Sequence, residues 1–366
     1  MRIKGNWLRF FTTVLVFGLA VIGCDIGDTN ENGDSRNNAT ELTLGKWADG
    51  TLAANGTQWF KFTAIAATQY IHFNFGSLTD LTITIYNNKN NIVVNETNLY
   101  GNASYVTLSA SIDQTYFIKV QPYVSHSGTY RISFSRSTSD SFEAAAAGGA
   151  VSLSQGIWAN GLLAANGVQW FSFTATETTK YIHVSFGSLP DLYLSIYNSN
   201  GMLVLNQTNL YNNTTYASLQ GSITSGQTYF IRVQPYESHN GTYQISLSRS
   251  TSDSFETALA GGAANLSQGI WANGLLAANG VQWFNFTTTG YTQYIHVSFG
   301  SLSDLYLSIY NSDGVLVLNQ TNLYNNTTYV NLSTTIGQTY FIRVQPYGSN
   351  SGNYQITFNT STTKPL

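Results

Sequence analysis

The residues best suited to binding chemistry are a tryptophan, a tyrosine and a histidine that recur three times along the chain. Because a strand sends successive side chains to opposite faces, Phe171 and Phe173 would share the core face and Trp170 would point outward. The first copy carries Lys61 on the same face as its tryptophan, which marks that face as the outer one. The next strand turns a tyrosine and a histidine outward by the same alternation. A flat apolar surface with polar edges suits a glycan or a peptide, so the predicted ligand-binding residues are Trp59, Tyr70, His72, Trp170, Tyr181, His183, Trp283, Tyr294 and His296.

Alternatively, each of these tryptophans is covered by another segment of the same chain and is not available to a ligand. A helix between repeats, or a strand at the start of a repeat, could lie over the indole. Burial of so large an apolar side chain is favourable, which makes the covered arrangement the preferred of the two. The repeated Tyr86, Tyr197 and Tyr310 are interpreted as packing on the sheet surface rather than as ligand contacts.

The sequence contains no pattern typical of catalysis. There is no GxSxG nucleophile turn and no HExxH metal pair. His126 and His239 fall in a turn where the third copy has Asn350, a substitution that an essential base would not tolerate. We therefore expect no catalytic residues and no enzymatic activity.

The first 24 residues predict the location of the protein. Three basic residues precede an apolar stretch, Phe10 to Ile22, that is too short to span a membrane, and Cys24 follows it as the only cysteine. This arrangement resembles a bacterial lipoprotein signal, which implies removal of residues 1–23, acylation of Cys24 and a lipid-anchored, extracytoplasmic place in the cell envelope. Acyl chains would hold the protein on a membrane. The alternative is an ordinary secretory signal with an incidental cysteine.

Composition narrows the class of partner. Charged residues make up only 9% of the 366-residue chain. Loss of residues 1–23 removes three basic side chains and no acidic ones, which takes the formal net charge from −3 to −6. A mildly acidic protein is a poor match for nucleic acid, and we expect none as a partner.

The chain repeats units of domain size. The string ANGTQWFKFTA returns as ANGVQWFSFTA and ANGVQWFNFTT, and the tryptophans at 59, 170 and 283 lie 111 and 113 residues apart. Alternating apolar and polar residues, with Asn-Gly turns between them, predict seven or eight short strands per unit and an Asn240-Gly241 hairpin between the last two. The fold class is thus all-β, three tandem antiparallel sandwich modules, jelly-roll-like, with short helical linkers. The expected domains are the signal peptide 1–23, the acylated cysteine and flexible tether 24–41, module 1 at 42–137, linker and module 2 at 138–250, and linker and module 3 at 251–366.

Each linker has the pattern of a short helix. Asp140 with Glu143, and Asp253 with Glu256, have the spacing of a capping box, and an alanine run followed by two glycines continues and then ends the helix. Linkers of one or two helical turns would join the modules with limited swing.

The order of these motifs resembles a known family. Modules 2 and 3 read DSFExA, then NG.QWF.F, DL.L.IYN..G and TYFIRVQPY, and end in a variant of SGTYQISLS, while module 1 carries the later motifs with small changes. This order is similar to the bacterial pre-peptidase C-terminal domain. The resemblance implies a non-catalytic β-sandwich of exported proteins, related to the collagen-binding domains of secreted collagenases. It also implies calcium as a candidate cofactor, with Asp140, Glu143, Asp253 and Glu256 as weak candidate ligands. The capping interpretation needs no metal, and no cofactor is otherwise expected.

The sequence leaves three functions open. The first is a lipid-anchored, multivalent binding or adhesion array for polysaccharide, peptidoglycan or host matrix, in which weak sites on short linkers gain avidity. The second is a structural stalk or envelope spacer without its own ligand. The third is an accessory subunit that holds a separate secreted enzyme.

Overall fold

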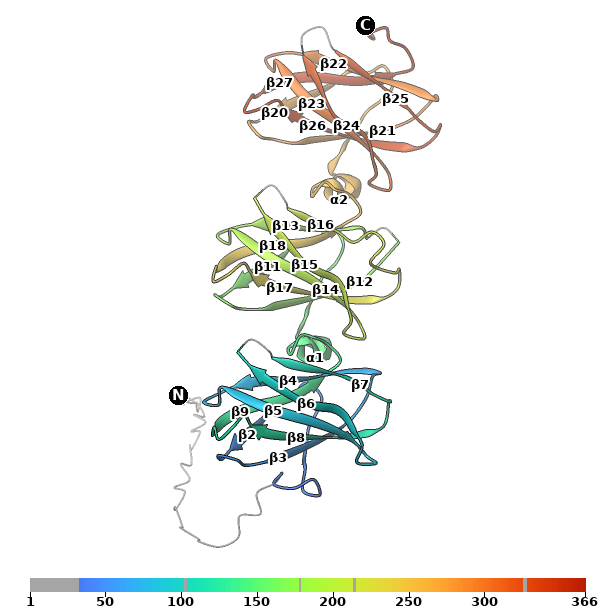
Figure 1. Cartoon of the computed structure of the whole chain (residues 1–366). Helices are drawn as coiled ribbons and strands as arrows, with labels where there is room; N and C mark the ends of the chain where they lie inside the picture. Colours follow the sequence, from blue (N-terminus) through green and yellow to red (C-terminus); the bar gives the residue numbers. More distant parts are fainter. Residues whose placement is uncertain (1–32, 102–103, 178, 213–214, 325–327) are drawn as a thin grey trace, which may run out of the picture.

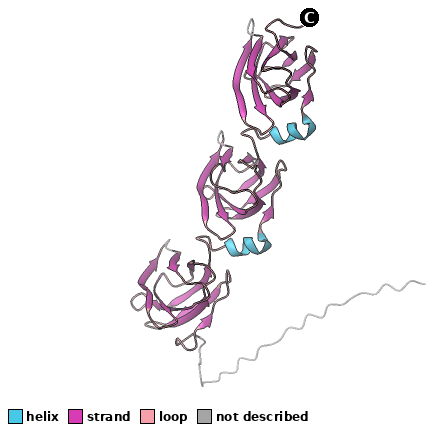
Figure 2. Cartoon of the chain, turned by 90° about the vertical axis from the view of Figure 1, so that its right-hand side faces the viewer, coloured by secondary structure: helices cyan, strands magenta, loops and turns pink. Residues whose placement is uncertain are grey.

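Three β-sandwich modules lie in line along one axis, with a short helix between neighbours (Figures 1 and 2). The computed structural model describes residues 33–101, 104–177, 179–212, 215–324 and 328–366. Each module is a pair of sheets with five and four strands. The predicted fold class is confirmed.

The three modules share one topology, in which successive strands alternate between the two sheets except for one hairpin within the five-stranded sheet, β5–β6, β14–β15 or β23–β24. In module 1 the five-stranded sheet is β1 (Thr40–Glu41), β3 (Gln58–Thr63), β8 (Thr115–Pro122), β5 (Asp80–Asn87) and β6 (Ile92–Tyr100), and the four-stranded sheet is β2 (Ala48–Leu52), β9 (Gly128–Ser135), β4 (Thr68–Phe75) and β7 (Tyr105–Ser109). In module 2 the corresponding strands are β10 (Val151–Ser152), β12 (Gln169–Thr174), β17 (Thr228–Pro235), β14 (Asp191–Asn198) and β15 (Leu203–Tyr211), then β11 (Ala159–Leu163), β18 (Gly241–Ser248), β13 (Tyr181–Phe186) and β16 (Tyr216–Ser218). In module 3 they are β19 (Ala264–Asn265), β21 (Gln282–Thr287), β26 (Thr339–Pro346), β23 (Asp304–Asn311) and β24 (Leu316–Tyr324), then β20 (Ala272–Leu276), β27 (Gly352–Asn359), β22 (Thr292–Phe299) and β25 (Tyr329–Ser333).

The alternation of the sequence explains how the sheets pack. Phe171 and Phe173 of β12 are buried between the sheets, whereas Trp170 lies on the outer face, as strand parity predicts. Each module has its own hydrophobic core of this kind. The paired strands run antiparallel, except that the short β1, β10 and β19 pair in parallel with β3, β12 and β21. Each sandwich can therefore be stable as a unit of about 100 residues.

Two local predictions need correction. The Asn240-Gly241 turn does not close a hairpin, because β17 belongs to the five-stranded sheet and β18 to the four-stranded one. The connection instead carries the chain across the sandwich. Residues 33–41, expected as part of a flexible tether, lie against module 1, where Thr40–Glu41 forms β1 beside β3.

A glycine and a tyrosine make a close contact at the same place in every module. In module 3, a Cβ atom on Gly274 would lie 2.2 Å from Cζ of Tyr354, so only glycine leaves room for the buried ring. The Tyr354 hydroxyl donates to Oε1 of Gln282, 2.9 Å away, which also accepts the backbone N–H of Leu275. The contact links the two sheets through β20, β21 and β27.

We expect Gly274→Ala to lower the free energy of unfolding by about 1–3 kcal/mol, because the added methyl group displaces the Tyr354 ring from the core. Scanning calorimetry of the purified protein measures the loss. The matched control is Tyr354→Phe, which removes only the hydroxyl and costs about 0.5–1.5 kcal/mol. An unchanged transition for Gly274→Ala would mean that the ring moves aside without cost.

Candidate functional site

The outward tryptophan of module 2 is covered by the linker that precedes it. Phe142, at the start of α1 (Phe142–Ala144), lies against Trp170, Tyr197 and Phe230, with ring centroids 6.0, 6.0 and 5.3 Å away. The indole N–H of Trp170 donates to Oγ of Ser141 at 3.1 Å. Only 7% of Trp170 remains exposed. We call Trp170, Tyr197 and Phe230 the aromatic socket of module 2.

Module 3 repeats the arrangement with α2 (Phe255–Thr257). Its aromatic socket consists of Trp283, Tyr310 and Phe341, and Phe255 fills it with ring centroids 5.9, 5.7 and 5.3 Å away. Trp283 is 8% exposed. In both modules the linker covers the tryptophan, which is the alternative that the sequence favoured. The tyrosine packs on the sheet surface, as predicted.

The same linkers are tied to the module that precedes them. In the first linker, Oε1 of Glu143 accepts the backbone N–H of Arg136 at 2.8 Å, and Oε2 pairs with Nη2 of Arg136 at 2.9 Å. In the second, Oε1 of Glu256 accepts both the backbone N–H of Arg249 at 2.9 Å and its Nε–H at 3.1 Å. The capping-box prediction is wrong, because the first residue of each helix is preceded by a serine whose side chain caps nothing, and the glutamate turns back toward the preceding strand. A π-helical turn follows each helix, η1 (Ala145–Gly149) and η2 (Ala258–Gly262), and a glycine at positive φ ends it, as predicted.

These contacts do not fit a calcium site at the four candidate acids. Both carboxylate oxygens of Glu143 are engaged by Arg136, and Asp140 is exposed to solvent. In the second linker, Asp253 is exposed and Oε1 of Glu256 is held by Arg249. Across the described ranges, no three His, Cys, Asp or Glu side chains gather in a way that could hold a metal ion.

Module 1 covers its aromatic socket differently. Trp59, Tyr86 and Phe117 occupy the equivalent positions, and the guanidinium of Arg36 lies 4.2 Å from the centre of the Phe117 ring. Arg36 also donates to Oδ1 of Asn90 at 2.7 Å. An arginine here takes the place of the linker phenylalanine, and Trp59 is only partly buried.

The predicted tyrosine and histidine residues do not join the tryptophans in one patch. Tyr181 and His183 lie on β13 in the four-stranded sheet, whereas Trp170 lies on β12 in the five-stranded sheet, so the two groups occupy opposite outer faces of the sandwich. The same holds for Tyr70, His72 and Trp59 in module 1, and for Tyr294, His296 and Trp283 in module 3.

The three strand histidines are buried rather than exposed. Nε2 of His183 lies 2.8 Å from the carbonyl oxygen of Ser250, where the following linker crosses the sheet. His72 makes the same contact with Ser137, and His296 with Ser361. Burial lowers the pKa of His72 and of His183, and the backbone carbonyl opposes this effect only in part. His72 and His183 therefore favour the neutral form, in which Nε2 donates to the linker carbonyl.

The remaining histidines have a structural role that the sequence did not reveal. Nδ1 of His239 lies 2.6 Å from Oδ1 of Asp191, and His126 makes the same contact with Asp80. Asn350 replaces the histidine in module 3 and donates to Asp304 at 2.6 Å. The aspartate of the DL motif therefore fixes a turn, which explains why an amide can stand in for the imidazole.

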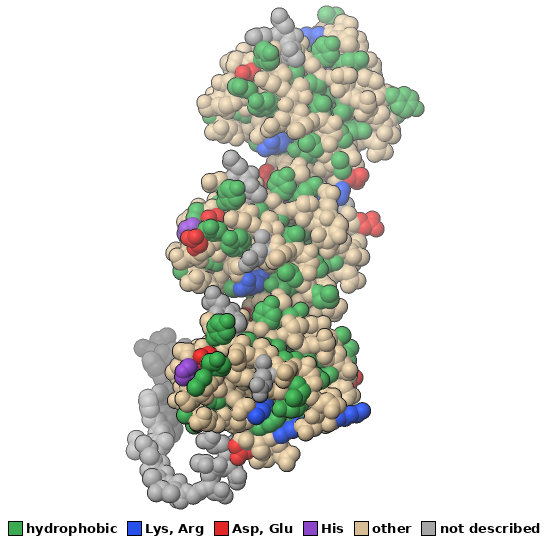
Figure 3. Space-filling model, viewed as in Figure 1, with side chains coloured by type: hydrophobic (Ala, Val, Ile, Leu, Met, Phe, Trp, Pro, Cys, Tyr) green, Lys and Arg blue, Asp and Glu red, His purple; other side chains and the backbone are tan. Residues whose placement is uncertain are grey.

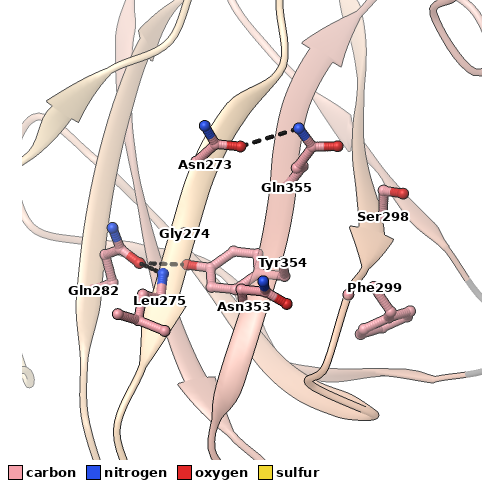
Figure 4. A pocket seen from close by; sticks show the side chains of 10 residues that line it. Asn273, Gly274, Leu275, Gln282, Ser298, Phe299, Asn353, Tyr354 and Gln355 are labelled. Atoms are coloured by element: carbon pink, nitrogen blue, oxygen red, sulfur yellow. Dashed lines mark hydrogen bonds between the residues drawn. The ribbon is translucent and has the colours of Figure 1, made fainter.

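A shallow groove lies on the outer face of each four-stranded sheet. In module 3 it has a volume of about 620 Å³ and lies above Gly274, between the Asn273–Gln355 pair and Phe299 (Figure 4). Modules 1 and 2 have the groove at the same place, around Gly50 and Gly161. Its polar side chains already bind one another, since Nε2 of Gln355 donates to Oδ1 of Asn273 at 3.0 Å.

The sequence of module 2 matches a family of known domains. Residues 167–235 match the bacterial pre-peptidase C-terminal domain. Domains of this family are non-catalytic β-sandwich modules of extracellular proteins. The pre-peptidase C-terminal match covers the socket residues Trp170, Tyr197 and Phe230, which come from three strands of the five-stranded sheet. No curated protein matches the chain.

Solved structures share little with the whole array. Tripeptidyl peptidase 2 is similar over 90% of this chain and 33% of its own, at 8% identity and a TM-score of 0.20. The CUB1-EGF-CUB2 region of human MASP-1/3 covers 55% of this chain and 99% of its own, at 7% identity and a TM-score of 0.16. A β-glucuronidase from Ruminococcus gnavus covers 52% and 35%, at 11% identity and a TM-score of 0.18. The chain thus spans about a third of tripeptidyl peptidase 2, and likeness of this size says nothing about function.

The buried histidines predict a loss of stability in mild acid. The pKa of His72 and His183 is lower in the folded protein than in the unfolded chain, so the unfolded chain binds protons first as the pH falls through about 6.5. We expect the urea midpoint to fall between about pH 7 and about pH 5.5, where most carboxylates stay ionised. The double variant His72→Gln, His183→Gln should lose much of this pH dependence. Equal slopes for the variant and the wild type would assign the effect to other groups.

Proposed function

We propose that the protein is a non-catalytic, lipid-anchored protein of the bacterial cell envelope whose three modules form a stiff stalk. One observation carries the proposal: each linker is packed into both of its neighbours. Phe142 fills the aromatic socket of module 2, while Glu143 binds Arg136 at the end of module 1. A linker held at both ends restrains the angle between the modules.

Direct contacts between neighbouring modules support the same proposal. The turn that joins β14 and β15 touches the end of module 1, where Nη1 of Arg136 donates to the carbonyl oxygen of Ser199 at 3.4 Å. A Cβ atom on Gly201 in this turn would lie 2.9 Å from the carbonyl oxygen of Arg136. Gly314 makes the equivalent close approach to Arg249 at the second junction. The turn therefore limits bending toward that side.

The membrane attachment in this proposal rests on the sequence around Cys24, which lies outside the described residues. In the described ranges, no helix is long and apolar enough to cross a membrane. An acylated Cys24 would leave residues 25–32 between the membrane and the first described residue.

A binding or adhesion array for polysaccharide, peptidoglycan or matrix is the second candidate. The recurrence of the groove in all three modules favours it, because aligned copies of one weak site gain affinity for a repetitive ligand. The stalk has stronger support, because the predicted tryptophan platforms of modules 2 and 3 are covered.

We expect Phe142→Ala to loosen the first junction. Truncation of a buried phenylalanine costs about 3–5 kcal/mol and empties the aromatic socket. Spin labels placed on exposed sites of modules 1 and 2 should give a broader distance distribution in the variant. Val151→Ala is the matched control, since Val151 lies just after η1 and is exposed. A distribution as narrow as that of the wild type would refute the stiff stalk.

A separate change tests the anchor. Cys24→Ser should move the protein from the membrane fraction to the soluble fraction of the producing bacterium, because no thiol is left to acylate. Ser35→Ala, beyond the anchor sequence, should leave the protein in the membrane fraction. Membrane retention of Cys24→Ser would contradict lipid anchoring at this residue.

A further inference from the structure

In modules 2 and 3, the linker covers only the part of the five-stranded sheet's outer face that carries the aromatic socket. In module 2, Trp170 pairs across the strands with Arg232, and the next row along the sheet places Gln234 opposite Tyr193. Tyr236 follows on the same side, and its ring centroid lies 5.3 Å from that of Tyr193 at an angle of 40°. These residues lie beyond the helix, on a part of the face open to solvent.

We call this open half the tyrosine patch. It consists of Tyr193, Asn209, Arg232, Gln234 and Tyr236 in module 2, and of Tyr306, Asn322, Arg343, Gln345 and Tyr347 in module 3. In module 2 Tyr193, Arg232 and Gln234 line one surface hollow of about 280 Å³ beside the Asn166-Gly167 turn. The tyrosine pair of module 3 has the same centroid distance and angle as that of module 2.

Both tyrosine patches contain the same unsatisfied polar atoms. Nε of Arg232 and Oδ1 of Asn209 are buried without a hydrogen-bond partner, and so are Nε of Arg343 and Oδ1 of Asn322. Such atoms cost free energy unless a partner is supplied. Within the described part of the chain, no carboxylate lies within ion-pair distance of either guanidinium. Both atoms are shielded from solvent beside the tyrosine, and Nη1 of each arginine already donates to the neighbouring glutamine, Gln234 or Gln345.

In module 1 the equivalent asparagine has a hydrogen-bond partner. Thr82 stands where modules 2 and 3 have Tyr193 and Tyr306, and its hydroxyl donates to Oδ1 of Asn98 at 2.7 Å. Lys119 stands at the position of Arg232. The tyrosine and the unsatisfied arginine and asparagine atoms beside it therefore occur together in modules 2 and 3, whereas the unsatisfied atom on the described face of module 1, Nε of Arg36, lies at the aromatic socket.

The chemistry of the patch indicates the class of ligand. A hydroxyl group donates and accepts, so it can bind both the guanidinium of Arg232 and the amide of Gln234, which line the hollow. A pair of tilted tyrosine rings presents an apolar surface with polar edges. Glu237 lines the same hollow as the cationic Arg232, so the site has no strong preference for an anion. We propose that modules 2 and 3 each bind a neutral saccharide chain at the tyrosine patch.

This site is independent of the stalk and lies on the opposite sheet from the groove in Figure 4. Figure 3 shows how few charged side chains the array presents on one side, which suits an uncharged ligand. Two patches on one chain would bind a long polysaccharide more tightly than a short one.

Calorimetric titration of the purified full-length protein tests the proposal. The probes are four neutral hexasaccharides, made of β-1,4-glucose, β-1,3-glucose, β-1,4-N-acetylglucosamine and α-1,6-mannose. We expect saturable binding of at least one. The double variant Tyr193→Thr, Tyr306→Thr should lose about tenfold or more in affinity. It should stay folded, because module 1 already combines threonine with asparagine at these positions. Tyr291→Thr, at an exposed tyrosine outside the patch, should bind as the wild type does.

A gain of binding provides a second readout. Thr82→Tyr with Lys119→Arg should create a patch in module 1 and raise the stoichiometry from two to three per chain. The proposal is overturned if none of the hexasaccharides binds, or if the Tyr193→Thr, Tyr306→Thr protein binds as the wild type does. Binding of a collagen-like peptide instead, lost in the same double variant, would overturn it in favour of a peptide site.

Discussion

The insertion of one linker phenylalanine into the aromatic socket of the next module is the contact on which the array depends. Phe142 and Phe255 are fully buried, although they belong to segments of only three helical residues. A helix this short has no stability of its own, so the socket must hold it in place. Because the following glutamate binds an arginine of the preceding module, one short segment completes the surface of two domains.

Module 1 shows what happens where no linker precedes a socket. Residues 33–41 cover it with polar groups, and Arg36 lies over Phe117 where an aromatic ring lies in the other modules. The guanidinium makes a cation–π contact with the Phe117 ring. Its N–H groups donate to the backbone carbonyl of Asn87 and to Oδ1 of Asn90. The socket is thus a conserved feature of this chain's three copies with two different ways of being filled.

Strand parity predicted most of the fold, because alternation is a local property. Phe171 and Phe173 face the core and Trp170 faces outward, as their spacing requires. Which sheet a strand joins is a non-local property, and here parity was insufficient: Trp170 and Tyr181 are close in sequence but lie on opposite sheets, since β12 pairs with β17 and β13 with β18. The role of Glu143 was missed for a related reason. The sequence pattern suggested that this carboxylate caps its own helix, but it binds Arg136 at the end of the preceding module. Cys24 lies outside the described residues, and its acylation stays a prediction.

The path of the chain through each sandwich has a mechanical consequence. In module 2 the chain enters at β10 in the five-stranded sheet and leaves from β18 in the four-stranded sheet. Tension along the array would therefore act on one sheet where the chain enters the module and on the other sheet where it leaves. The side-chain core between the sheets shares that load with the hydrogen bonds that join β10 to β12 and β18 to its neighbours. Resistance to force would depend in part on Phe171, Phe173 and their neighbours in the core. Because the modules are joined end to end, each would carry the same force and would unfold as a separate unit.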